Sequence, residues 1–134
     1  MKSILKSWTA AALTVAGLAL SGTALAHHSF AAFDMNKTAS VSGTVKAFQW
    51  TNPHVYIILE VGSGADATIW RMEGGPPVNL VRGGWRDDTL SPGDKITVSY
   101  HPRRDGTHGG SFVSATLPDG KQIGAMGPPP AAGK

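Results

Sequence analysis

The chain has 134 residues, a formal net charge of +3 at neutral pH and no cysteine. A chain of this length predicts one folded domain. The lack of cysteine excludes a disulfide framework, thiolate metal sites and a cysteine nucleophile, so stability must come from packing.

The N-terminal segment has the three parts of a secretory signal peptide. Lys2 and Lys6 precede an apolar run at residues 9–20, and small residues lead to an A-x-A tripeptide that ends at Ala26. The apolar run is shorter than the roughly 20 residues that span a bilayer, which favours cleavage over the alternative of an uncleaved anchor. We therefore expect residues 1–26 to be removed and the remaining protein to be periplasmic or secreted.

Removal of this segment leaves a nearly neutral chain. Two of the twelve basic residues go with it, so ten basic and nine acidic residues remain. The isoelectric point of about 9.5 for the whole chain therefore says little about the mature protein. Nucleic acid is a poor candidate partner for an exported, nearly neutral domain.

Alternating apolar and polar residues predict a β-domain at residues 27–123, followed by a disordered Pro/Gly/Ala tail at residues 124–134. Pro76 and Pro77 before a short apolar stretch and Gly83 after it predict one short helix. The expected strands occupy residues 40–48, 54–61, 67–72, 95–100 and 111–117, with a shorter strand at residues 121–123.

The alternation also assigns side chains to the two faces of these strands. The odd-numbered residues from Val55 to Val61 form an apolar face, and His54 and Tyr56 lie on the opposite face. In the strand at residues 40–48, Phe48 falls on the polar face.

The predicted fold class is all-β. The element order is that of a small OB-like barrel, with five to six short antiparallel strands and one short helix between strands 3 and 4. Another small antiparallel barrel or sandwich is the alternative.

The histidines are the strongest candidate metal ligands in a chain without cysteine, because imidazole suits copper, zinc and nickel. Cleavage after Ala26 would give His27 a free α-amine, whose ordinary pKa of about 7.7–8.0 lets Cu(II) displace its proton near neutral pH. His27, His28 and His54 are the predicted metal ligands, and copper is the favoured ion. A terminal histidine resembles the histidine brace of secreted copper proteins such as the lytic polysaccharide monooxygenases, and the resemblance is confined to that residue. His101 and His108 are expected to be solvated surface residues.

Aromatic side chains suggest a second kind of site. Trp50, Tyr56 and Trp70 lie on or near the second and third strands, and stacking on such rings would serve a carbohydrate or another planar ligand. The alternative, which we favour, is that these rings are core or capping residues. The candidate ligand-binding residues are Trp50, Asn52, Tyr56, Trp70, Glu73 and Trp85.

Sequence signatures of common enzymes are missing. The chain has no G-x-S-x-G, P-loop, H-E-x-x-H or dinucleotide-binding motif. We therefore expect an exported binding module that holds a transition metal through His27, rather than an enzyme. Binding of a small molecule, glycan or protein partner across the aromatic face is one alternative, and a copper-dependent redox enzyme is another.

Several short motifs occur together in this chain. A-H-H-S-F-A-A-F-D follows the signal, and V-S-G-T-V-K-A-F-Q-W-T-N-P-H-V-Y-I, W-R-M-E-G-G-P-P, L-V-R-G-G-W and L-S-P-G-D come later. Together they resemble domain-of-unknown-function family 6152, a family of small exported bacterial proteins. The resemblance covers about residues 27–123. It implies a bacterial periplasmic or secreted β-domain and supplies no catalytic residues. The residues in its motif positions are His27, His28, Trp50, Asn52, Pro53, His54, Glu73 and Trp85.

Overall fold

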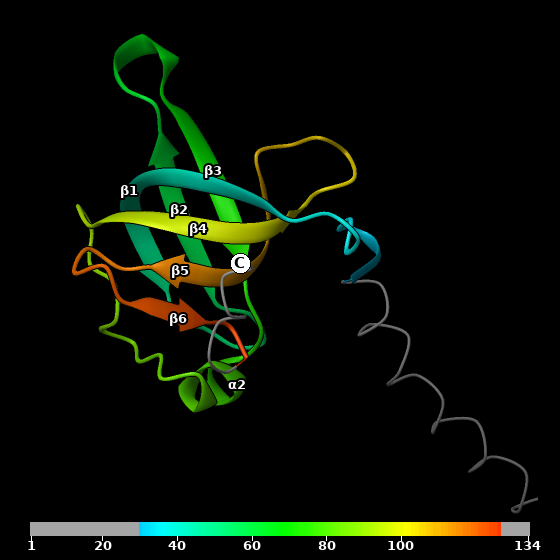
Figure 1. The fold of residues 1–134 in the computed structure, drawn as a ribbon, viewed down its shortest axis with the longest axis vertical. Helices are drawn as coiled ribbons and strands as arrows, with labels where there is room; N and C mark the ends of the chain where they lie inside the picture. The colour runs from blue at the N-terminus through cyan, green and yellow to red at the C-terminus, as the bar shows by residue number, and fades with distance from the viewer. Residues whose placement is uncertain (1–29, 127–134) are drawn as a thin grey trace, which may run out of the picture. The chain divides into compact units, whose positions relative to one another are not determined.

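The computed structural model describes residues 30–126, and residues 32–126 belong to one compact unit. Its regular structure is almost entirely β, as Figure 1 shows. The strands are β1 (Ala39–Gln49), β2 (Tyr56–Val61), β3 (Thr68–Glu73), β4 (Lys95–Pro102), β5 (Gly109–Thr116) and β6 (Gln122–Gly124). A 3-10 turn, η1 (Gly64–Asp66), joins β2 to β3, and a short helix, α2 (Pro77–Arg82), lies between β3 and β4. No helix of the described part is long and apolar enough to cross a membrane.

The sheet closes on itself to form a barrel. Its strand order is β3-β2-β1-β4-β5-β6, and β3 also pairs with β5 in parallel. This extra pairing makes a closed ring of β1, β2, β3, β5 and β4. The sixth strand, β6, pairs antiparallel with the C-terminal half of β5. The predicted small all-β barrel, with its helix between the third and fourth strands, is confirmed.

The closure between β3 and β5 depends on a glycine. Arg71 of β3 lies opposite Gly109 of β5, and the Arg71 N–H donates to the carbonyl of His108 at 3.3 Å. Gly109 has φ of +142°, and a Cβ at this position would collide with the backbone of Arg71. Only glycine combines this backbone angle with so close an approach of two strands.

A β-bulge in β1 overturns one assignment of the sequence analysis. The pairing between β1 and β2 shifts between Val45 and Ala47, so the alternation changes phase there. Phe48 then lies opposite Ile57, which is fully buried, and packs against the core. The prediction that Phe48 faces outward with the polar residues was therefore wrong, because a simple period of two does not include the extra residue of a bulge.

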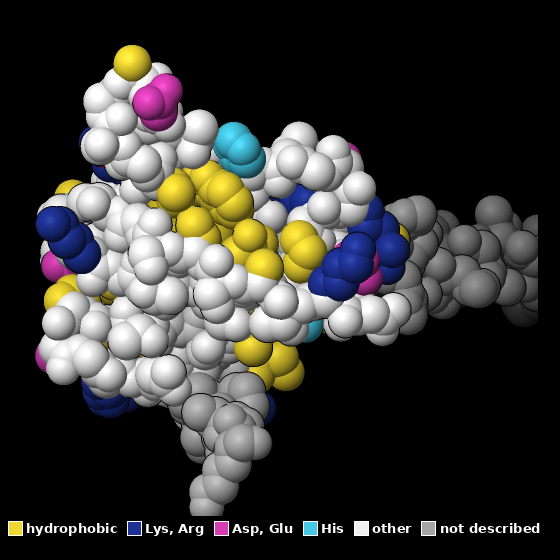
Figure 2. Space-filling model, turned by 45° about the horizontal axis from the view of Figure 1, so that its top comes forward, with side chains coloured by type: hydrophobic (Ala, Val, Ile, Leu, Met, Phe, Trp, Pro, Cys, Tyr) yellow, Lys and Arg dark blue, Asp and Glu magenta, His cyan; other side chains and the backbone are white. Residues whose placement is uncertain are grey.

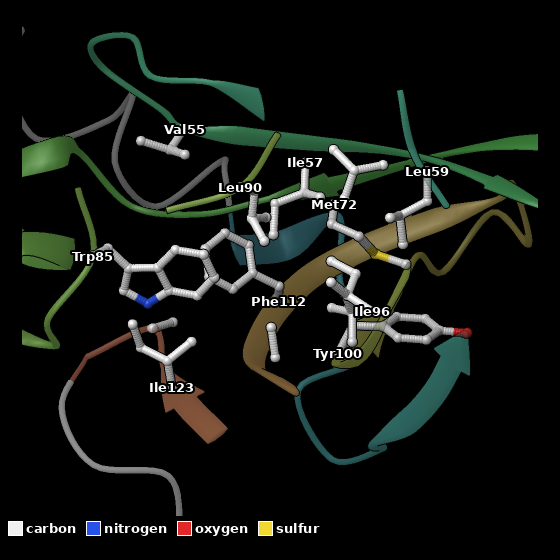
Figure 3. Close-up of a cluster of buried hydrophobic side chains, with 14 of the residues drawn as sticks. Val55, Ile57, Leu59, Met72, Trp85, Leu90, Ile96, Tyr100, Phe112 and Ile123 are labelled. Carbon is white, nitrogen blue, oxygen red and sulfur yellow. The ribbon is translucent and has the colours of Figure 1, made fainter. Parts of the chain in front are cut away.

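The core fills the barrel with apolar side chains from every strand of the closed ring, several of which Figure 3 shows converging. Trp85 is fully buried at one end of this core, and its ring lies 5.8 Å from Phe48 and 5.4 Å from Phe112. The indole N–H of Trp85 donates to the carbonyl of Gly124 at 2.9 Å, so its polar atom is satisfied. The largest fully buried side chains are Trp85, Ile57, Leu59, Met72, Leu80, Val45, Val55 and Val98.

The C-terminal boundary of the domain differs from the prediction. Gly124 ends β6, and Ala125 is buried and donates its N–H to the carbonyl of Val113 at 2.8 Å. The predicted tail at residues 124–134 therefore starts too early, because a glycine and an alanine have no side-chain pattern that reveals a strand end. The predicted signal peptide and the rest of the predicted tail lie outside the described residues.

Candidate functional site

The outer surface of β2 and β3 gathers several of the predicted site residues. In the antiparallel pairing, Tyr56 lies opposite Glu73 and Ile58 lies opposite Arg71. Ile57 and Met72, the next pair, are fully buried, so Tyr56 and Glu73 must face away from the core. His54 precedes β2 at the same end, which brings His54, Tyr56 and Glu73 together as one group.

The backbone around His54 is tied to the segment after β3. The Val55 N–H donates to the carbonyl of Gly75 at 3.2 Å, and the Gly74 N–H donates to the carbonyl of Val55 at 2.8 Å. Within the preceding turn, the Thr51 hydroxyl donates to the carbonyl of His54 at 2.8 Å. His54 is therefore placed by hydrogen bonds on both sides rather than by a free loop.

The ring of His54 has a defined orientation. Its Nδ1 lies 3.1 Å from the carbonyl oxygen of Gly74 and 3.2 Å from Oε1 of Glu73. A carbonyl can only accept, so the contact with Gly74 assigns the hydrogen to Nδ1. The side chain of His54 is 32% exposed and that of Glu73 is 16% exposed. Nε2 is therefore the ring nitrogen that the neutral tautomer offers as a lone-pair donor.

Tyr56 and Arg71 extend the site along the outer face. The guanidinium carbon of Arg71 lies 3.8 Å from the centre of the Tyr56 ring, a close cation–π contact. The rings of His54 and Tyr56 are 6.3 Å apart. The site thus combines an imidazole, a carboxylate and an arginine that is stacked on a phenol ring.

The structure does not form the single aromatic face that the sequence predicts. Trp70 lies opposite Leu59, which is fully buried, and is packed against the core, whereas Tyr56 is on the outer face. Trp50 is also packed against the core, and the centre of its ring lies 5.6 Å from that of Phe48. Trp85 is buried and accessible to no ligand in this conformation. The positions of Trp50, Trp70 and Trp85 therefore agree with the alternative that these rings are core or capping residues.

The remaining predicted residues are placed as follows. Asn52 is exposed in the turn before His54, where the Asn52–Pro53 peptide is cis. His27 and His28, and with them the predicted terminal metal site, lie outside the described residues. Among residues 30–126, no three His, Asp or Glu side chains are grouped as metal ligands.

Two histidines have contacts that the sequence analysis missed. His101 is half-buried, and its Nδ1 lies 2.7 Å from the carbonyl oxygen of Lys37. His108 is exposed, yet its ring stacks on Trp70 with 4.9 Å between ring centres and an interplanar angle of 1°. A glycine-rich sequence predicts a loop but gives no sign of which ring that loop will meet.

Comparisons with known proteins add one finding. A family model described as "Family of unknown function (DUF6152)" matches residues 15–112. No curated protein and no solved structure matches the chain.

Proposed function

This chain belongs to the DUF6152 family, and we propose that it is an exported binding module that takes up a transition metal ion, with copper as the favoured metal. His54 is the ligand that the described residues supply. The proposal concerns binding and storage or transfer of the ion, not turnover of a substrate.

The observation that supports the proposal is the fixed ring of His54. Histidines that bind metals usually donate their other ring N–H to a carbonyl or a carboxylate, which sets the tautomer and raises the basicity of the ligating nitrogen. His54 has both kinds of acceptor at Nδ1, the carbonyl of Gly74 and the carboxylate of Glu73. Nε2 would therefore bind the ion, and Glu73 would act as the supporting acceptor.

One imidazole does not make a site, so further donors must complete the coordination. The proposal assigns them to the mature N-terminus, where His27 would offer an α-amine and a ring nitrogen, and to His28. Nitrogen donors of this kind suit Cu(II) better than other divalent ions of the first transition row. A bound copper ion would supply redox or Lewis-acid character at the position it occupies.

The test uses the mature protein, which begins at His27, purified without a metal-affinity tag. Its affinity for Cu(II) is measured by competition with a chelator, and the bound ion is examined by EPR. We expect His54→Ala to weaken Cu(II) binding and to change the EPR spectrum. The matched control is His101→Ala, which removes another histidine that is hydrogen-bonded to a backbone carbonyl.

Two further variants test the His27 α-amine and the Glu73 carboxylate separately. One extra glycine before His27 removes the α-amine of that residue, and we expect it to weaken binding as well. Glu73→Gln keeps the size of the side chain but loses the charge, and we expect affinity to fall by about 10-fold or more, as for other outer-sphere partners of metal ligands. Equal Cu(II) affinity for the wild type, His54→Ala and the extended chain would overturn the proposal.

Export and cleavage of the predicted signal peptide are tested by a separate measurement. N-terminal sequencing of protein recovered from the periplasm or the medium of a producing bacterium should begin at His27. A first residue other than His27, or retention of the first 26 residues, would contradict the predicted terminus.

A further inference from the structure

Trp70 lies at the boundary between the core and the solvent. Its side chain is on the inner face of β3, opposite the fully buried Leu59, but it is only half-buried. Tyr100 meets it edge to face, with ring centres 5.8 Å apart and an angle of 80° between the rings. The indole N–H of Trp70 donates to the hydroxyl of Thr68 at 3.0 Å. The contacts with Thr68 and Tyr100 thus hold the indole in place and leave one of its flat faces for another ring.

His108 occupies that face. The two rings are parallel to within 1°, and their centres are 4.9 Å apart, which is an offset stack. His108 itself is exposed, so it contributes little to the core. Figure 2 shows a hydrophobic patch on one face of the molecule with a histidine at its border.

The loop that carries His108 is anchored by its backbone to β3, where the Arg71 N–H donates to the carbonyl of His108 at 3.3 Å, so only the side chain of His108 needs to move to uncover Trp70. Gly106 and Gly109 stand on either side of Thr107 and His108, with φ of +75° and +142°. Within the loop, Oδ1 of Asp105 accepts from the N–H and the hydroxyl of Thr107 at 3.0 and 2.7 Å, and these bonds lower the pKa of Asp105. Asp105 and Thr107 form a small turn of their own, whereas the imidazole ring of His108 rests on Trp70.

We propose that the face of Trp70 on which His108 stacks is a binding platform for a small planar heteroaromatic molecule, and that His108 covers this platform in the free protein. The imidazole of His108 is itself a planar heteroaromatic ring, and it shows the geometry that the platform accepts. A ligand would displace His108 and stack on Trp70 in its place. This site is separate from the proposed metal site, which uses the outer face of β2 and β3.

His108 and a ligand would compete for the same face of Trp70, so the strength of the stack predicts how much ligand affinity rises when His108 is removed. An aromatic pair contributes about 0.5–1.5 kcal/mol beyond the area that it buries. Removing the competing ring should therefore tighten ligand binding by about two- to tenfold. A purely structural role for the stack predicts no such gain.

The test uses caffeine, a neutral planar heteroaromatic molecule, and an excess of a metal chelator excludes any contribution of metal binding. Caffeine is titrated into isotope-labelled protein while the indole N–H signals are followed by NMR, and Trp70→Leu identifies the signal of Trp70. We expect the Trp70 signal to move with a saturable dependence on caffeine. We expect His108→Ala to bind about two- to tenfold more tightly, and His108→Phe, which keeps a competing ring, to stay close to the wild type.

Trp70→Leu keeps apolar contact with the core but removes the indole face, and we expect it to lose the saturable response while its spectrum remains that of a folded protein. Methyl glucoside is the second ligand, and we expect it to leave the Trp70 signal unchanged. Equal affinity of the wild type and His108→Ala for caffeine would overturn the proposal. Larger shifts at Trp50 or Trp85 than at Trp70, or an equal response to the glucoside, would overturn it too.

Discussion

Two parts of the barrel present a histidine next to an aromatic ring, and they hold it in opposite ways. His54 is hydrogen-bonded through Nδ1 to the carbonyl of Gly74, with the carboxylate of Glu73 at 3.2 Å from the same nitrogen, and its flanking backbone is bonded to the segment after β3. His108 lies in a loop bordered by glycines and rests on the face of Trp70. The ring of His54 has one fixed tautomer and direction, whereas the ring of His108 is the one that we propose a ligand displaces.

This difference separates two kinds of function. A metal ligand must be oriented before the ion arrives, because a loosely held donor loses affinity. A cover over a binding platform must be held weakly, because the ligand has to displace it. Measurements that compare the two regions therefore test whether each histidine has the character that we assign to it.

The largest difference in the free energy of unfolding is expected when the aromatic residue of each region is replaced. Trp70→Ala should lower the free energy of unfolding by about 2–3 kcal/mol, somewhat less than the 3–5 kcal/mol typical of a fully buried tryptophan. Tyr56→Ala, on the outer face beside His54, should cost less than about 1 kcal/mol, because it loses mainly a cation–π contact with Arg71. Equilibrium denaturation in urea measures both values. Equal losses would contradict the assignment of Trp70 to the inner face and Tyr56 to the outer face.

A smaller effect is expected from the carboxylate that supports His54. Glu73→Ala should lower the free energy of unfolding by about 1 kcal/mol, since it removes a carboxylate that lies 3.2 Å from Nδ1 of a partly buried ring. Glu60→Ala is the matched control, because Glu60 pairs with Lys46 at 3.2 Å on the more exposed part of the same face. We expect that control to cost less than about 0.5 kcal/mol. A control that costs more than Glu73→Ala would argue against a fixed His54 ring.

The cover itself should contribute still less to stability. His108→Ala should lower the free energy of unfolding by about 0.5 kcal/mol, the lower end of the range for an aromatic pair, because the ring is exposed. Thermal denaturation of this variant and of the wild type measures the difference. A loss of more than about 2 kcal/mol would make His108 a structural residue rather than a displaceable one.

The last effect appears only in alkaline solution. Burial raises the pKa of Tyr100 above its ordinary value of 10.0, so the folded protein holds the phenol proton more tightly than the unfolded chain does. The stabilisation that this represents is complete below pH 10 and is lost as the pH rises through the pKa of the folded state. Denaturation at a series of pH values above 9 should show the wild type losing stability more steeply than Tyr100→Phe. Parallel curves would show that Tyr100 is not buried beside Trp70.

The sequence predicted more of the His54 region than of the Trp70 region, for a physical reason. His54 and Tyr56 follow a regular alternation with Val55 and Ile57, and the partner strand that carries Glu73 is the next one along the chain. His54 and Glu73 were both candidates because they fall in motif positions of the family that the chain resembles, and strands that follow each other in the chain often pair. Their direct contact still depended on the register between β2 and β3, which no local pattern specifies.

The stack of His108 on Trp70 could not be anticipated in the same way. It depends on the parallel pairing of β3 with β5, and therefore on the close approach of Gly109 to Arg71 across the barrel closure. From the sequence, Trp70 and Tyr56 could form a common ligand-binding face because both lie on or near the second and third strands, although core or capping positions were the favoured alternative. Their registers place them on opposite faces, and the bulge in β1 likewise moved Phe48 to the inside.

The proposed metal-binding role of the His54 ring is tested most directly by NMR of the histidine side chains in a chain that begins at His27. Before metal is added, nitrogen correlation spectra should show His54 with its hydrogen on Nδ1. When substoichiometric Cu(II) is added, the ring signals of His54 should broaden before those of His101 and His108. A hydrogen on Nε2, or His54 signals that stay sharp while His101 or His108 broadens, would contradict the proposed site.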